Sequence, residues 1–157
     1  GLMTTEDIAR TRPWGEPSGS SSSYGGNPLA AAATAAALHI IDAEGLVHNA
    51  RKVGQVLLDE LRDLPERFPF VGLVDGRGLM LRIELVRDQQ TREPLAKAAC
   101  QRLFHLLVER GLLCMATSPH LRLQPALTLD ADTARTAAGL LREGLATMAA
   151  ANWWRQP

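Results

Sequence analysis

The sequence has few cysteines, no excess of either charge and no long apolar run. Its two cysteines, Cys100 and Cys114, stand alone at spacings unlike those of metal sites, which favours reduced, buried thiols. The 17 basic residues balance the 17 acidic ones, so charge gives no indication of nucleic acid or an anionic membrane as a partner. No apolar run approaches the roughly 20 residues that cross a bilayer. We therefore expect a cytoplasmic protein whose partners are small molecules or other proteins.

Lysine is equally scarce. The chain has only Lys52 and Lys97, and both fall on helix faces that are expected to be exposed. The four histidines are scattered, one to an element, so none is assigned to a metal or to proton transfer. The side chains most used for nucleophilic and metal chemistry are thus few and isolated.

A hydroxyl-rich and glycine-rich turn, residues 20–27, leads directly into an alanine-rich segment. Pro28 stands where a first helical residue is expected, with Asn27 before it as the cap. The turn therefore points toward a helix N-terminus, where free N–H groups and the helix dipole favour an anion. Composition alone is more typical of a flexible linker. A phosphate-binding turn and a linker both stay open at this point.

Helical periodicity is expected over residues 28–44, 46–64, 94–110 and about 128–150, after one short turn near residues 5–10. The alanines of residues 30–37 suit a helix that is buried against another backbone. In the next helix apolar side chains step by three and four from Leu46 to Leu64, and Pro65 is expected to end it. The tail residues Trp153 and Trp154 are expected to pack onto the body of the protein or onto a partner.

Strands are expected between these helices, over residues 71–75, 79–86, 112–116 and 120–124. Gly76-Arg77-Gly78 is most simply a tight turn between the first two. In the second strand the odd-numbered residues are apolar and the even-numbered ones include Arg82 and Glu84, so one face of the sheet is expected to be covered. The order of elements predicts an α+β fold: an antiparallel sheet of three or four strands with helices on one face.

Four ordered motifs carry a resemblance to a known family. They are Ser23 to Ala30, Asp42 to Leu46, Asp75 to Leu81 and Leu121 to Leu127. Together they resemble the C-terminal part of class III aminotransferases, the pyridoxal-phosphate enzymes of fold type I. The resemblance implies that residues 1–27 end the large cofactor-binding domain, that 28–44 form a connecting alanine-rich helix, and that 45–157 form the small C-terminal domain. The abrupt start of the sequence suits a chain that begins inside a larger domain.

The resemblance also implies site residues. In the family the first motif lies at the interface of a homodimer, and a hydroxyl residue there binds the cofactor phosphate of the neighbouring subunit. Here that position is Ser23, where the family usually has threonine, and Ser22, Tyr24 and Gly25 are expected to share the site. Arg122 matches the family arginine that binds the carboxylate of the amino or oxo acid, a task that suits a planar guanidinium.

The lysine that forms the Schiff base with pyridoxal 5′-phosphate precedes the turn in the family, and neither Lys52 nor Lys97 matches it. No catalytic residue is therefore assigned to this chain. We expect the C-terminal portion of an aminotransferase that moves an amino group from an amine or ω-amino acid to a 2-oxo acid, inactive by itself. The alternative is a naturally truncated, non-catalytic module for dimerisation or regulation of a transaminase.

Overall fold

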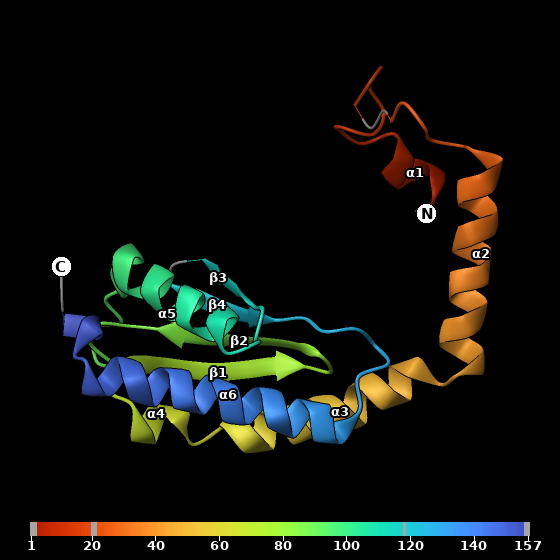
Figure 1. The fold of residues 1–157 in the computed structure, drawn as a ribbon. Helices are drawn as coiled ribbons and strands as arrows, with labels where there is room; N and C mark the ends of the chain where they lie inside the picture. The colour runs from red at the N-terminus through yellow and green to blue at the C-terminus, as the bar shows by residue number, and fades with distance from the viewer. Residues whose placement is uncertain (1–2, 20–21, 118, 156–157) are drawn as a thin grey trace. The chain divides into compact units, whose positions relative to one another are not determined.

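The computed structural model describes residues 3–19, 22–117 and 119–155. The chain forms two compact units, Gly1–Glu44 and Gly45–Pro157 (Figure 1). The first unit contains a single helical turn, α1 (Glu6–Ala9), and the long helix α2 (Pro28–Ala43). The side chain of Asn27 caps α2, as predicted, by accepting hydrogen bonds from the N–H groups of Leu29 at 2.8 Å and Ala30 at 3.3 Å.

Every residue of helix α2 except the half-buried Ile41 is exposed. No residue of α2 is buried, and Leu29 and Leu38 have 79% and 63% of their surface accessible. The prediction of a buried alanine-rich helix is therefore wrong for this chain. The physical reason is that, among the described residues of this unit, the one other helix is the single turn α1.

The second unit is built on a four-stranded antiparallel sheet in the order β1-β2-β4-β3. The strands are β1 (Val71–Arg77), β2 (Met80–Leu85), β3 (Met115–Thr117) and β4 (His120–Leu123). Along β2 the burial alternates: Leu81, Ile83 and Leu85 are buried whereas Met80 and Arg82 are exposed. One face of the sheet is thus covered and the other is open, as the sequence pattern predicts.

The turn between β1 and β2 lies at Gly78 and Leu79, not at residues 76–78 as predicted. Strand β1 extends through Arg77, which pairs with Met80. Gly78 has a φ of +56° at the first central position of this two-residue turn, where a hairpin needs a positive φ that glycine adopts without strain. The shorter turn changes which residues face each other across the hairpin.

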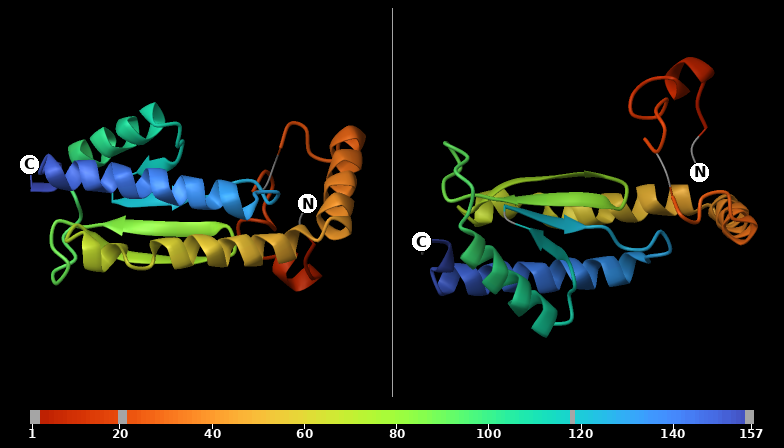
Figure 2. Two further views of the ribbon diagram at one scale, coloured as in Figure 1. Left: turned by 60° about the horizontal axis from the view of Figure 1, so that its bottom comes forward. Right: turned by 90° about the horizontal axis from the view of Figure 1, so that it is seen from above.

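Three long helices supply the covered face: α3 (Leu46–Leu61), α5 (Lys97–Glu109) and α6 (Ala131–Ala150). The right-hand view of Figure 2 shows α5 and α6 on one side of the sheet. The fold class is therefore the predicted one. The core contains Val53, Leu57 and Leu61 of α3, Leu103 and Leu107 of α5, and Ala138, Leu141 and Leu145 of α6.

Several helix ends differ from the prediction. Helix α3 ends at Leu61, and Pro65 lies in the first turn of the short helix α4 (Leu64–Arg67). Proline is tolerated there because the first N–H groups of a helix have no intrahelical partner. Helix α5 begins at Lys97, three residues after the predicted start, and α6 begins at Ala131 because the Asp130 side chain caps it through the N–H groups of Asp132 and Thr133.

The C-terminal tail packs onto the body of the second unit. Trp153 and Trp154 are half-buried in the short helix η1 (Trp153–Arg155), and the Trp154 ring lies 5.7 Å from that of Phe70. Of the two destinations predicted for the tryptophans, the structure shows the body. Within the described part of the chain, no single helix is both long and apolar enough to cross a membrane; α2 and residues 46–67 meet that test only when joined.

Candidate functional site

The turn before α2 presents hydroxyl groups and backbone N–H groups at the surface. Ser22, Ser23, Tyr24 and Gly25 are all exposed. The Ser22 hydroxyl oxygen accepts a hydrogen bond from the Tyr24 N–H at 3.4 Å, and the Ser22 carbonyl accepts one from the Gly25 N–H at 3.2 Å. No hydrogen bond is formed by the Ser23 hydroxyl with any other described residue. Ser20 and Ser21 lie outside the described residues.

The N-terminus of α2 does not itself offer a free anion site. Pro28 has no N–H, and the next two N–H groups donate to the Asn27 side chain. The expectation of free helical N–H groups at this point is therefore wrong, because the cap occupies them. An anion at the turn would bind to the serine hydroxyls and to those preceding N–H groups that do not already donate within the turn, as the N–H groups of Tyr24, Gly25 and Asn27 do.

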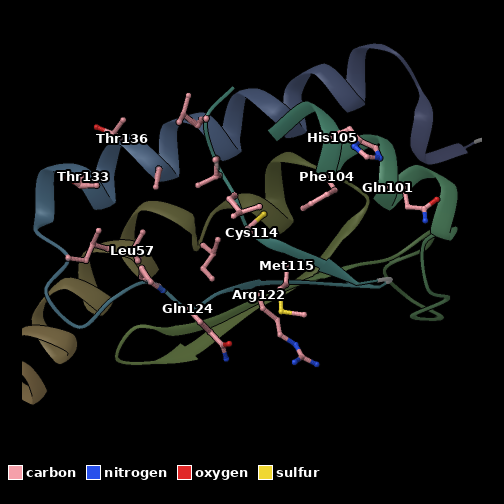
Figure 3. Close-up of a pocket in the computed structure, with 18 residues that line it drawn as sticks. Leu57, Gln101, Phe104, His105, Cys114, Met115, Arg122, Gln124, Thr133 and Thr136 are labelled. Atoms are coloured by element: carbon pink, nitrogen blue, oxygen red, sulfur yellow. The ribbon is translucent and has the colours of Figure 1, made fainter. Parts of the chain in front are cut away.

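Arg122 lies on the open face of the sheet in the second unit. Its neighbours on β4, Leu121 and Leu123, are buried whereas Arg122 is exposed, as alternation predicts. In Figure 3 the side chains of Arg122 and Gln124 point away from α6. The guanidinium of Arg122 makes no hydrogen bond or ion pair with the residues that the structure describes. It is available to a ligand.

A second arginine stands beside it in a different state. Arg82 on β2 faces Arg122 directly in the antiparallel register. Two hydrogen bonds join Arg82 to Asp75 of β1, from Nε to Oδ1 at 2.8 Å and from Nη2 to Oδ2 at 2.9 Å. Hydrogen bonding from Arg82 holds the pKa of Asp75 below its usual value, and the same pair raises the pKa of Arg82. Asp75 therefore stays ionised and its charge offsets that of Arg82.

These side chains line a shallow hollow of about 370 Å³ on the open face. Its lining is formed by Asp75, Gly76, Met80, Leu81, Arg82, Arg122 and Gln124. A larger groove of about 1010 Å³, drawn in Figure 3, runs between α5, α6 and the end of the sheet and is mostly apolar. The smaller hollow combines an unpaired cation with apolar atoms. This combination suits a short carboxylate better than it suits a neutral ligand.

The described residues contain no cluster of histidine, cysteine or acidic side chains that could hold a metal. Cys100 and Cys114 are both buried thiols, as predicted. Burial raises the pKa of Cys114 to about 11, so its thiol is protonated near neutral pH. Lys52 and Lys97 are both exposed.

Comparison with known proteins now identifies the family. The model of the aminotransferase class-III family matches residues 1–145. The chain belongs to the class III aminotransferases.

Several known proteins are similar in sequence or structure to this class III aminotransferase chain. It is 42% identical to the taurine–pyruvate aminotransferase of Rhodobacter capsulatus over 97 residues, which are 62% of this chain and 21% of that protein. It is 36% identical over 110 residues to the ethanolamine-phosphate phospho-lyase homolog 1 of Caenorhabditis elegans, covering 68% of this chain and 24% of that protein. The crystal structure of an amine transaminase from an uncultivated Pseudomonas species, with pyridoxal 5′-phosphate bound, superposes with a TM-score of 0.76 at 39% identity, over 80% of this chain and 29% of that one. The chain thus spans about a quarter of the length of these relatives.

Pyridoxal 5′-phosphate is the cofactor of class III aminotransferases, and the turn fits its phosphate group. Exposed hydroxyls and N–H groups are the donors that phosphate oxygens accept from. A Cβ added at Gly26 would meet nothing within 4 Å, so there is open space beside the turn, and the φ of +76° at Gly26 favours glycine. Ser22, Ser23, Tyr24 and Gly25 lie together in this turn, whereas Arg122 belongs to the second unit.

Sequence reasoning missed the environment of Arg122. It did not identify Asp75, Arg82 or Gln124 as neighbours of that residue. Nor did it foresee Asn49, whose side-chain amide donates to the carbonyls of Leu127 at 2.7 Å and Leu129 at 3.0 Å and so fixes the segment after β4 against α3. The signal for the first two was present: in a two-residue hairpin turn at 78–79, residues 75 and 82 face each other.

Proposed function

We propose that this chain is the C-terminal portion of a pyridoxal-phosphate-dependent aminotransferase. The enzyme would move an amino group from an amine or ω-amino acid to a 2-oxo acid, in the cytoplasm. Family membership supports the reaction class, and the unpaired guanidinium of Arg122 is the observation that carries the assignment of a carboxylate site. The similarity to a taurine–pyruvate aminotransferase and to an amine transaminase supports a small amine as the donor.

The turn Ser22–Gly25 would bind the phosphate of pyridoxal 5′-phosphate held by the neighbouring subunit of a homodimer. Ser23 would donate its hydroxyl, since that group has no other partner among the described residues. Gly25, which has no side chain, would let the phosphate approach the backbone beside the exposed ring of Tyr24. When bound, the cofactor supplies the carbonyl and the electron sink that amino transfer needs.

Arg122 would hold the carboxylate of the acid. A planar guanidinium donates two parallel hydrogen bonds to a carboxylate and so fixes its orientation as well as its position. The residue is set on a strand whose flanking leucines are buried, which leaves its backbone little freedom to shift. This rigidity would place the reacting carbon of the acid reproducibly.

The chain alone would not transaminate. Lys52 lies on the exposed side of α3 and Lys97 opens α5, and neither lines the hollow at Arg122. A Schiff-base lysine is needed to hold the cofactor and to move a proton between the reacting carbons. We propose that this lysine belongs to a part of the enzyme outside residues 1–157.

Kinetics of the complete enzyme that contains these residues would test the roles. Arg122→Gln should raise the KM for the 2-oxo acid about tenfold to a hundredfold, the worth of a charge-assisted pair of about 1.5–3 kcal/mol. Arg135→Gln is the matched control, because Arg135 is an exposed arginine of α6 that pairs with Asp132 away from the hollow. Ser23→Ala should weaken cofactor binding about tenfold, from loss of one hydrogen bond to a charged phosphate worth about 1.5 kcal/mol. An unchanged KM in Arg122→Gln would refute the carboxylate role.

A second function is supported by the apolar side chains that α2 exposes, among them Leu29 and Leu38. Such a surface suits a protein partner. The chain would then be a non-catalytic module that docks onto a transaminase subunit for dimerisation or regulation. The gene sequence upstream of residue 1 separates the two proposals: an in-frame segment encoding a strand-end lysine supports the enzyme portion, and a genuine start codon at this point supports the module. A clean monomer without exposed apolar surface, in a size measurement of the purified chain, would count against the missing partner that both proposals assume.

A further inference from the structure

The open face of the sheet carries two arginines side by side, of which only one is free. Arg82 and Arg122 face each other across β2 and β4, and both are exposed. Like charges in directly opposed positions on a sheet repel each other. Asp75 relieves the repulsion from the other side of β2, because it faces Arg82 across the β1–β2 hairpin.

Asp75 binds Arg82 in a geometry that uses the whole carboxylate. Each carboxylate oxygen accepts one hydrogen bond from the guanidinium, at 2.8 and 2.9 Å. The bidentate arrangement is the strong form of this pair. It also fixes where the Arg82 head lies, at the rim of the hollow that Arg122 lines.

We infer that Asp75 is a specificity-determining residue that makes the hollow select 2-oxo acids with one carboxylate over those with two. It does so by holding Arg82, which leaves Arg122 as the free guanidinium of the hollow. The inference rests on the proposed carboxylate role of Arg122. Asp75 acts through Arg82 and is a positioning residue, not a catalytic one.

The spacing of the two arginines explains why their pairing state controls selectivity. Opposed residues on antiparallel strands have Cα atoms about 4.5–5.5 Å apart, so two free guanidinium groups could each bind one end of a short dicarboxylate. With Asp75 in place, the second carboxylate would have to displace an ionised side chain of its own sign. A monocarboxylate makes no such demand, and Met80 and Leu81 offer apolar atoms to its remainder.

Binding to the chain of residues 1–157 tests this without the cofactor. Pyruvate and 2-oxoglutarate serve as the one-carboxylate and two-carboxylate probes, titrated at low salt and followed by NMR of the arginine Nε–H groups. The variants are Asp75→Asn, the double variant Asp75→Asn with Arg82→Gln, and Arg122→Gln. Glu84→Gln is the charge-matched control, since it frees Arg92 from an ion pair on the same face but outside the hollow.

In Asp75→Asn we expect 2-oxoglutarate to bind about fivefold more tightly while the Kd of pyruvate changes less than about twofold, the scale of one exposed ion pair. The double variant should return the ratio of the two dissociation constants to the wild-type value. Glu84→Gln should leave that ratio unchanged.

The same experiment separates the inference from the function on which it rests. If Arg122→Gln weakens pyruvate binding but Asp75→Asn leaves the ratio unchanged, the carboxylate role stands and the role of Asp75 is refuted. An equal shift of the ratio in Glu84→Gln also refutes it, since general charge would then be the cause. If Arg122→Gln does not weaken pyruvate binding, or the wild-type chain binds no pyruvate, the carboxylate role of Arg122 and the selectivity role of Asp75 are both refuted.

Discussion

Substitution of Gly54 by alanine should destabilise the second unit, because helix α3 touches the β1–β2 turn there. A Cβ added at Gly54 would lie 2.0 Å from the carbonyl oxygen of Gly78 and 2.3 Å from its carbonyl carbon. Both are backbone atoms, so no side chain can rotate away. The helix and the hairpin that carries Asp75 must separate instead.

The expected loss can be worked out from two opposing effects. Overpacking against a fixed backbone costs about 3 kcal/mol, and alanine regains about 1 kcal/mol of helix propensity over glycine, which leaves about 2 kcal/mol. For a unit the size of Gly45–Pro157, the unfolding entropy is about 0.24 kcal/mol per kelvin. The Tm should therefore fall by about 8 °C.

The assay is thermal unfolding of the purified chain by calorimetry, with Gly139→Ala as the matched control. Gly139 also lies inside a helix, but a Cβ there would meet nothing within 4 Å. Its Tm should rise by about 2–4 °C from helix propensity alone. If Gly54→Ala melts at or above the wild-type temperature, the close packing of α3 on the hairpin is refuted.

Three further predictions concern stability and reactivity. Trp154→Ala should lower the free energy of unfolding by about 2 kcal/mol, because it removes the contact with Phe70; the loss is smaller than for a fully buried ring, since Trp154 is half-buried. The same calorimetry checks this, and an unchanged Tm would contradict the packing of the tail. Hydrogen bonding from Arg142 lowers the pKa of Asp63, so this carboxyl stabilises the fold above its unfolded pKa of about 3.9, and the effect is lost as the pH falls through the lower folded value. The stability advantage of the wild type over Asp63→Asn, about 1 kcal/mol for a pair that is only partly buried, should shrink in unfolding curves between pH 5 and pH 2, and a constant difference would count against it. Cys114, with its pKa raised to about 11, should react with a thiol reagent at pH 8 far more slowly in the native chain than in denaturant, and equal rates would show that the thiol is accessible.

Most of the second unit could be predicted from apolar spacing, because its elements bury one face each. The α6 positions Ala134, Ala138, Leu141, Leu145 and Met148 are all buried, as their spacing predicts. Alternation on β4 likewise predicted the exposure of Arg122 between two buried leucines. Where a helix or strand buries one face, the spacing of its apolar residues predicts which side chains are buried.

Other features depend on contacts that periodicity does not encode. Placing the hairpin turn at residues 76–78 would set Asp75 opposite Leu79 and hide its pairing with Arg82, so an error of turn position concealed the environment of the site. The exposure of α2 could not be predicted from its alanines, because burial depends on which neighbours are present. The Asn27 cap was predicted, yet its consequence, that helical N–H groups are occupied, requires the geometry of the two hydrogen bonds.

The most direct test of the central claim asks whether this chain holds the cofactor covalently. Residues 1–157 are incubated with one equivalent of pyridoxal 5′-phosphate, reduced with borohydride, and examined by intact mass and peptide mapping, with amino transfer from a small amine to pyruvate assayed in parallel. The account predicts no preferred modification at Lys52 or Lys97 beyond that of the denatured chain, and no transfer. Stoichiometric labelling of one of these lysines together with turnover of the amine would contradict it.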